Sequence, residues 1–285
     1  MKLHCADRIL DLTVAQVMGV LNTTPDSFSD GGQFSDLSAA IKQAEAMHID
    51  GATIIDVGGE STRPGAEPVT LQQEMDRVIP VIENIAANID VCISVDTSSA
   101  QVMSEAEKAG AHILNDVRAL SRDGALEVAV KTGLPVCLMH MQGEPSTMQV
   151  NPSYSQVVND VFGFLQARIS ECESAGLEKS RILIDPGFGF GKSMAHNYQL
   201  LGQLDRFLDL GVPVLAGLSR KSMIGSVLQD PQGEARPVDE RLHGSVAGAL
   251  IAVMNGAKIV RVHDVKATSD ALRIFKASQE YGLIT

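Results

Sequence analysis

Residues 181–193 read RILIDPGFGFGKS, a short apolar run that ends in a carboxylate where a glycine-rich loop begins. The loop is not a phosphate-binding P-loop, because that motif requires a glycine five residues before Gly191 and Pro186 stands there. The dinucleotide-binding motif fails as well, since Lys192 occupies the place of its third glycine. We therefore interpret Ile182–Ile184 as a buried strand, with Asp185 rather than the glycines as the chemically important residue.

The same pattern, an apolar run followed by a longer amphipathic segment, repeats along the chain of 285 residues. Helices are expected at residues 37–48, 71–86 and 247–255. The alternation predicts a parallel sheet, and eight units predict closure into a (β/α)8 TIM barrel as a single domain of residues 1–285. Residues 2–12 are expected to form a short N-terminal hairpin over the bottom of the barrel. The apolar runs are Val17–Leu21, Thr53–Val57, Val91–Val95, His112–Asp116, Val136–Met139, Ile182–Ile184, Val212–Leu215 and Ile259–Val262.

The protein is acidic, with a formal net charge of −12. This charge argues against sequence-independent binding of nucleic acid, which depends on many contacts from Lys and Arg to phosphate. The four cysteines are far apart, without zinc spacing or a disulfide framework, and are expected to be small buried residues. Neither a signal peptide nor a membrane-spanning apolar run is visible, so we expect a cytoplasmic protein that does not enter a membrane.

In a barrel of this kind, the carboxyl ends of the strands and the loops that follow them build the site. Polar residues gather at these ends, and a buried carboxylate needs a partner, which a ligand rich in N–H donors would supply. Two long segments, residues 22–35 and 58–69, follow the first two runs and are expected to be functional loops. The strand-end residues are Asn22, Asp56, Asp96, Asn115, Asp116, His140, Asp185, Ser219, Arg220, Lys221, Arg261, His263 and Asp264.

These residues also have simpler interpretations. Asp and Asn at a strand end often cap the next helix, and His140 is more easily explained by packing than by catalysis. Arg261 and His263 lie two apart and so face the same side of a strand, where they suit an anion better than a metal; local pairing with Asp264 is the alternative. The basic residues expected at this face favour phosphate or carboxylate. They are Arg63, Arg220, Lys221, Arg261 and His263.

Seven motifs, in order along nearly the whole chain, resemble the dihydropteroate synthase family of pterin-binding TIM barrels. They are MGVLNTTPDSFSDGG (18–32), IIDVGGESTRPGA (54–66), SVDT (94–97), ILNDV (113–117), DPGFGFGK (185–192), GLSRKSMIG (217–225) and RVHDV (261–265). The resemblance implies a transferase of folate biosynthesis that condenses 6-hydroxymethyl-7,8-dihydropterin pyrophosphate with 4-aminobenzoate, giving 7,8-dihydropteroate and pyrophosphate. It also implies Mg²⁺, inhibition by sulfonamides, and a homodimer, for which we expect the surface around residues 247–281.

The resemblance assigns roles by position. The pterin would meet Asp96, Asn115, Asp185 and Lys221. The pyrophosphate would meet Asn22, Thr62, Arg63, Arg261 and His263, with Asn22 facing the metal. The 4-aminobenzoate slot would be lined by Phe28, Thr62, Arg63, Pro64, Phe190, Lys221 and Ser222. Asp96, Asp185, Lys221 and Arg63 are the expected catalytic residues, whereas we interpret Lys192 as a solvated lysine.

No nucleophile arrangement of the Ser-His-Asp or Cys-His type is apparent, and the amine of 4-aminobenzoate is itself nucleophilic. The resemblance therefore implies an SN1-like reaction in which pyrophosphate departs first. A methyltetrahydrofolate-binding methyltransferase barrel is the alternative, but it has no use for the pyrophosphate residues. A non-catalytic pterin-binding regulator should have lost Asn22, Arg63 or Lys221, but all three are present. A phosphosugar isomerase would need a glutamate base at a strand end, and none of the expected strands ends in glutamate.

Overall fold

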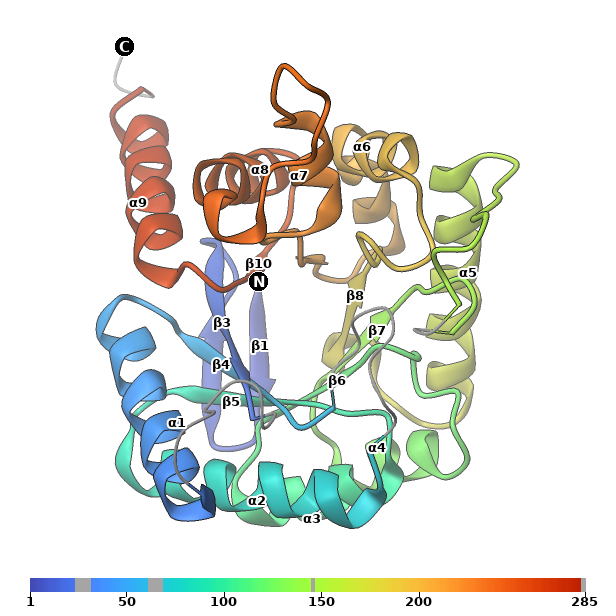
Figure 1. Cartoon of the computed structure of the whole chain (residues 1–285). Coiled ribbons are helices and arrows are strands. Elements are labelled where there is room, and N and C mark those ends of the chain that lie inside the picture. Colours follow the sequence, from blue (N-terminus) through green and yellow to red (C-terminus); the bar gives the residue numbers. More distant parts are fainter. Residues whose placement is uncertain (24–31, 61–68, 145–146, 283–285) are drawn as a thin grey trace.

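A parallel sheet of eight strands, surrounded by helices, forms the body of the protein (Figure 1). The computed structural model describes residues 1–23, 32–60, 69–144 and 147–282, with residues 32–36 described by their backbone. The barrel strands are β3 (Gln16–Asn22), β4 (Ile54–Gly58), β5 (Cys92–Asp96), β6 (Ile113–Asp116), β7 (Val136–Met139), β8 (Ile182–Asp185), β9 (Leu215–Ala216) and β10 (Ile259–Val262). The helices are α1 (Gly32–Ile49), α2 (Leu71–Asn88), α3 (Ala100–Ala109), α4 (Ala125–Thr132), α5 (Val157–Ser174), α6 (Met194–Gly202), α7 (Ser222–Val227), α8 (Leu242–Met254) and α9 (Val265–Gly282).

The strands follow one another around the sheet in the order β8-β7-β6-β5-β4-β3-β10-β9. A parallel bridge between Ile184 and Val214 joins the two ends of this order, so the sheet closes on itself. The prediction of a (β/α)8 TIM barrel is therefore confirmed, and each expected apolar run contains all or part of a strand. The run at Val212–Leu215 is placed less well, since β9 begins only at its last residue.

The predicted hairpin is also confirmed. Strands β1 (Lys2–Cys5) and β2 (Arg8–Asp11) pair antiparallel, with Leu3 opposite Leu10. Leu3, Cys5, Leu10 and Leu12 are buried in a cluster that includes one side chain from every barrel strand. The barrel members of this cluster are Met18, Ile54, Cys92, Ile113, Cys137, Leu183, Leu215 and Ile259. The hairpin thus closes the amino-terminal end of the barrel with apolar side chains.

The layer above this cluster is polar. Side chains two residues apart on a strand share a face, so the residues two positions beyond the cluster also point into the barrel. They are Val20, Asp56, Ser94, Asn115, Met139, Asp185, Gly217 and Arg261. The strand period therefore places the ionisable groups one layer above a sealed apolar floor, toward the carboxyl ends of the strands.

A second and larger apolar cluster fills the space between the sheet and the helices. The predicted helices at 37–48 and 71–86 lie within α1 and α2, and the one predicted at 247–255 overlaps α8. All four cysteines are buried and free, as expected. Within the described residues, no helix is both long and apolar enough to cross a membrane.

The apolar floor predicts that Leu3→Ala lowers the free energy of unfolding by about 2–5 kcal/mol, the usual range for removing a buried leucine side chain. Turnover per folded molecule should not change, because the side chains of the apolar floor separate the hairpin from the polar layer. Urea denaturation together with the specific activity measures both quantities. Ile9→Ala, in the same hairpin but 58% exposed, is the matched control. Equal losses of stability in the two variants would contradict the role of the hairpin as a plug.

Candidate active site

A half-buried arginine, Arg261, is held by two carboxylates in the polar layer. Arg261 Nε donates to Asp56 Oδ2 at 2.6 Å, and Arg261 Nη2 donates to Asp96 Oδ2 at 2.8 Å. Burial raises the pKa of Asp96 to about 7, against the opposing effect of Arg261. Burial disfavours the charged form of Arg261, but Asp56 and Asp96 outweigh it and raise the pKa of the guanidinium. The alternative pairing of Arg261 with Asp264 is wrong.

Polar atoms without a partner lie in the same layer. Asn115 Nδ2 donates to Asp56 Oδ2 at 3.1 Å, so one oxygen of Asp56 serves both Asn115 and Arg261. Asp56 Oδ1 and Ser94 Oγ are buried and, in the described part of the chain, have no hydrogen-bond partner. Asp56 and Ser94 are also opposite each other in the register of β4 and β5. Buried polar atoms are nearly always paired, so this layer is suited to a ligand that brings N–H donors.

Asp185 ends β8 and is bound by the loop that follows it. The backbone N–H of Gly187 donates to Asp185 Oδ1 at 2.7 Å, and burial raises the pKa of the carboxyl. Gly187, Gly189 and Gly191 all have positive φ angles, between 64° and 78°. A Cβ at Gly187 would lie 1.9 Å from the carbonyl oxygen of His140, so only glycine fits at this position.

Lys221 reaches across this loop from the segment between β9 and α7. Its Nζ donates to the carbonyl oxygen of Phe188 and lies 4.6 Å from the centre of the Phe190 ring. Burial lowers the pKa of Lys221 to about 8, although Asp185 acts in the opposite direction. Lys221 is therefore a cation that interacts electrostatically with the carboxyl group of Asp185.

The interpretation of Lys192 as a solvated lysine is wrong, since its residue is only 3% exposed. Lys192 Nζ lies 2.9 Å from His140 Nδ1 and donates to the carbonyl oxygens of Gly187 at 2.9 Å and Phe190 at 3.0 Å. Burial lowers the pKa of Lys192 to about 7. His140 is itself buried against Phe164, and burial followed by the charge of Lys192 lowers its pKa to about 3. The packing interpretation of His140 is confirmed.

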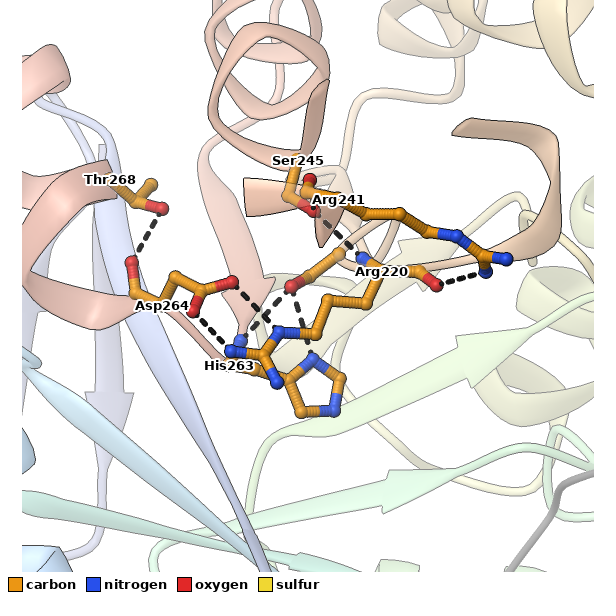
Figure 2. Close-up of polar contacts among 7 residues, drawn as sticks. Arg220, Arg241, Ser245, His263, Asp264 and Thr268 are labelled. Carbon is orange, nitrogen blue, oxygen red and sulfur yellow. Dashed lines mark hydrogen bonds and ion pairs between the residues drawn. The ribbon is translucent and has the colours of Figure 1, made fainter. Parts of the chain in front are cut away.

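Arg220 is a structural residue rather than a free anion-binding side chain (Figure 2). Its guanidinium pairs with Asp264, a hydrogen bond and ion pair that raise the pKa of Arg220. Its backbone has φ 59°, an uncommon value for a residue with a side chain. Ser245 Oγ accepts from its N–H at 2.9 Å, and Arg241 Nη1 donates to its carbonyl oxygen at 2.9 Å.

The residues on either side of Arg220 in the chain, Ser219 and Lys221, both contact predicted site residues. Ser219 Oγ accepts from the backbone N–H of His263 at 3.2 Å and lies 3.0 Å from His263 Nδ1, which joins the ends of β9 and β10 (Figure 2). On the other side of Arg220, Lys221 precedes the first turn of α7. Arg220, with its positive φ angle, therefore lies between Ser219, which contacts the His263 ring, and Lys221.

The structure brings together Asp96, Asn115, Asp185, Lys221 and Arg261 around the barrel interior, with His263 at the end of β10. Asn22 ends β3 opposite Gly58, Phe190 is half-buried beside Lys221, and Ser222 is the exposed first residue of α7. Phe28, Thr62, Arg63 and Pro64 lie outside the described residues. Sequence reasoning placed Asp56 among the strand-end residues but gave it no role in a pocket, although its period-two spacing from Ile54 was the available signal. Nothing local distinguished Lys192 from an exposed lysine.

Comparison with known proteins agrees with this geometry. A family model for pterin binding enzymes matches residues 18–263. A dihydropteroate synthase of Haemophilus influenzae is 58% identical over 278 residues, which are 98% of this chain and 99% of that protein. This similarity over the full length excludes the methyltransferase, regulator and isomerase alternatives.

Solved structures give the same result. A Yersinia pestis dihydropteroate synthase with a sulfonamide drug complex has a TM-score of 0.92 and 52% identity, covering 98% of this chain and 100% of that one. A Xanthomonas albilineans dihydropteroate synthase with 4-aminobenzoic acid has a TM-score of 0.91 and 49% identity, covering 98% of both chains. The chain therefore belongs to the dihydropteroate synthase family of pterin-binding enzymes, the transferases that make dihydropteroate in folate biosynthesis.

Proposed function

We propose that the barrel interior binds the dihydropterin ring of 6-hydroxymethyl-7,8-dihydropterin pyrophosphate and joins its methylene carbon to the amine of 4-aminobenzoate. The observation that carries this proposal is the set of acceptors at the strand ends, the buried Asn115 and Asp185 and the half-buried Asp96, together with the cation of Lys221. A pterin has an exocyclic amine and ring N–H groups along one edge, which match these acceptors, and a carbonyl oxygen that Lys221 can reach. Asp56 Oδ1 and Ser94 Oγ add further unpaired polar atoms to the same pocket.

The reaction follows from charge. The bond between the methylene carbon and the pyrophosphate oxygen breaks first, and both bonding electrons leave with pyrophosphate. The resulting pterin methylene cation lies among the carboxylates of Asp96 and Asp185, which are fixed before the bond breaks and therefore stabilise developing positive charge. The amine nitrogen of 4-aminobenzoate then forms the new bond to carbon and loses a proton.

Arg261, His263, Asn22, Thr62 and Arg63 are proposed to hold the pyrophosphate. Arg261 donates to Asp56 and Asp96 through Nε and Nη2, which supports a position for Arg261 between the proposed pterin pocket and the leaving group. Ser219 supports the ring orientation of His263 through its contact with Nδ1. The positive charge of these residues favours departure of an anion.

Mg²⁺ fits the site as an ion that enters with the pyrophosphate. In the described part of the chain, no group of three or more His, Cys, Asp or Glu side chains could hold a metal ion. Mg²⁺ commonly keeps several waters and binds through one or two protein ligands together with substrate phosphates. Asn22, at the carboxyl end of β3, is the proposed protein ligand. The ion would supply charge that neutralises the departing pyrophosphate.

The proposed 4-aminobenzoate slot lies between Phe190, Lys221 and Ser222 on the described side, and Phe28, Thr62, Arg63 and Pro64 complete it. The relative from Xanthomonas albilineans was solved with 4-aminobenzoic acid, and the one from Yersinia pestis with a sulfonamide drug complex. Sulfonamides copy the ring, amine and anionic end of 4-aminobenzoate, so we propose that they compete for this slot. The contact between the Phe190 ring and the Lys221 ammonium supports this slot, because the two side chains present an aromatic face and a cation together.

We also propose a homodimer in the cytoplasm. Helices α8 and α9 expose apolar side chains on one side of the barrel, among them Ile251 at 44%, Met254 at 62% and Ile274 at 74% exposed. Four free, buried cysteines are consistent with a reducing compartment. Sedimentation should give twice the mass of the chain, and a single-chain mass at micromolar concentration would contradict the dimer.

Asp185→Asn is expected to weaken binding of 6-hydroxymethylpterin by about 1.5–3 kcal/mol, the usual value of a hydrogen bond to a charged group. The amide can still accept the Gly187 N–H, but its NH₂ group presents donors to the donor-rich edge of the pterin. Calorimetry measures the affinity. Asp205→Asn, an exposed aspartate far from the site, is the control. Unchanged affinity in Asp185→Asn would show that Asp185 only fixes its own loop.

The pH dependence of pterin affinity should be bell-shaped. Affinity should rise as pH increases through about 7, because Asp96 must lose a proton to accept fully. It should fall at higher pH as Lys192, with a pKa of about 7, and Lys221, with a pKa of about 8, lose their charge. Calorimetry between about pH 5.5 and pH 9.5 measures the profile. Asp96→Asn should remove the acid limb, and Lys221→Met should remove the part of the alkaline limb near pH 8. An acid limb that persists in Asp96→Asn would assign that proton to another group.

A further inference from the structure

The glycine loop after β8 contains one turn hydrogen bond, from the Phe190 N–H to the Gly187 carbonyl oxygen at 3.1 Å, and is otherwise held by side chains. Five consecutive carbonyl oxygens each accept a hydrogen bond from a side chain. The donors are Lys192 for Gly187, Lys221 for Phe188, Gln149 for Gly189, Lys192 for Phe190 and Tyr154 for Gly191. The loop thus has a fixed shape despite its glycines, and Lys192 is the one donor that binds it twice.

Lys192 also fastens the loop to the neighbouring strand. Its Nζ lies 2.9 Å from His140 Nδ1 and 3.3 Å from the carbonyl oxygen of His140, the residue directly after β7. Because the pKa of His140 lies near 3, its ring is neutral and Nδ1 can accept a hydrogen bond from the Lys192 ammonium. One ammonium group therefore joins the end of β7 to both ends of the Gly187–Phe190 turn.

These contacts lead from Lys192 to the carboxylate of Asp185. The carbonyl oxygen of Gly187 accepts from Lys192, and the N–H of the same residue donates to Asp185 Oδ1 at 2.7 Å. Movement of Gly187 would rotate the carboxyl group about its side-chain bonds and change which oxygen faces the barrel interior. The position of the Gly187 peptide, and with it the orientation of Asp185, depends on the Lys192 ammonium.

We propose that Lys192 is a positioning residue of the enzyme, which orients Asp185 toward the pterin by holding the Gly187–Phe190 turn against His140. Lys192 does not touch the substrate in this arrangement and acts through Gly187. The inference rests on the proposed contact between Asp185 and the pterin. An ammonium is suited to the position because it offers three donors on one atom, whereas an amide offers two and a thioether none.

The test compares the affinity of folded protein for 6-hydroxymethylpterin in Lys192→Met, Lys192→Gln and the unaltered chain. We expect the dissociation constant to rise at least tenfold in Lys192→Met and by a smaller factor in Lys192→Gln, which keeps two donors. Calorimetry gives the affinity, and near-ultraviolet circular dichroism with urea denaturation gives the folded fraction and stability. Asn255→Leu is the matched control, because it removes a side-chain bond to the carbonyl oxygen of Leu201 at 2.7 Å, away from the site.

A purely structural role would lower stability in Lys192→Met, as in Asn255→Leu, but leave the pterin affinity of the folded molecules within twofold of the unaltered chain. That result would overturn the proposal. Failure of both Lys192 variants to fold would overturn it too, since Lys192 would then be required for folding rather than for orientation. Asp185→Asn distinguishes failure of the proposed pterin contact from failure of the positioning role. If Asp185→Asn does not weaken pterin binding, the proposed contact of Asp185 with the pterin is wrong. If Asp185→Asn weakens binding but the Lys192 variants do not, only the role of Lys192 is wrong.

Discussion

The alternation of side chains along eight parallel strands is the constraint on which the rest of the structure depends. Because residues two apart on a strand share a face, each strand carries an apolar side chain in the floor, and every strand but β9 carries a second inward side chain directly above it. Ile54 lies below Asp56, Leu183 below Asp185, and Ile259 below Arg261. The hairpin seals the floor from the other end, so the charged layer lies between an apolar floor and the loops at the carboxyl ends of the strands.

Burial of the charged groups in that layer costs desolvation free energy unless the groups are paired. Arg261 meets this requirement with Asp56 and Asp96, and Lys192 does so with the carbonyl oxygens of the glycine loop. The pairing is incomplete at Asp56 Oδ1 and Ser94 Oγ, as expected of a pocket that a donor-rich ligand completes. The same low-dielectric surroundings that shift the pKa values of Asp96 and Lys221 toward neutrality strengthen the attraction between carboxylates and a developing cation.

The barrel, the hairpin plug and the strand-end position of the pterin residues could all be predicted from the sequence, because each depends on local period and on which end of a strand a residue occupies. The contacts that fix those residues could not. Arg261 pairs with Asp56 across 205 residues of sequence, and Lys192 finds His140 across 52. A single lysine in a glycine-rich loop is expected to be exposed, because the sequence does not show that folding brings the neighbouring strand against it. The pairing of Asp264 with Arg220 rather than with Arg261 likewise depends on the closed barrel.

Product formation tests the central claim most directly, namely that this pocket ionises a pterin pyrophosphate and passes the methylene carbon to an arylamine. The purified protein would be incubated with 6-hydroxymethyl-7,8-dihydropterin pyrophosphate and Mg²⁺, with and without 4-aminobenzoate, while dihydropteroate and pyrophosphate are measured. The account predicts equal amounts of both products when 4-aminobenzoate is present, and loss of both in Asp185→Asn. Dihydropteroate formation at an undiminished rate in Asp185→Asn would contradict it, as would the absence of dihydropteroate from the complete mixture.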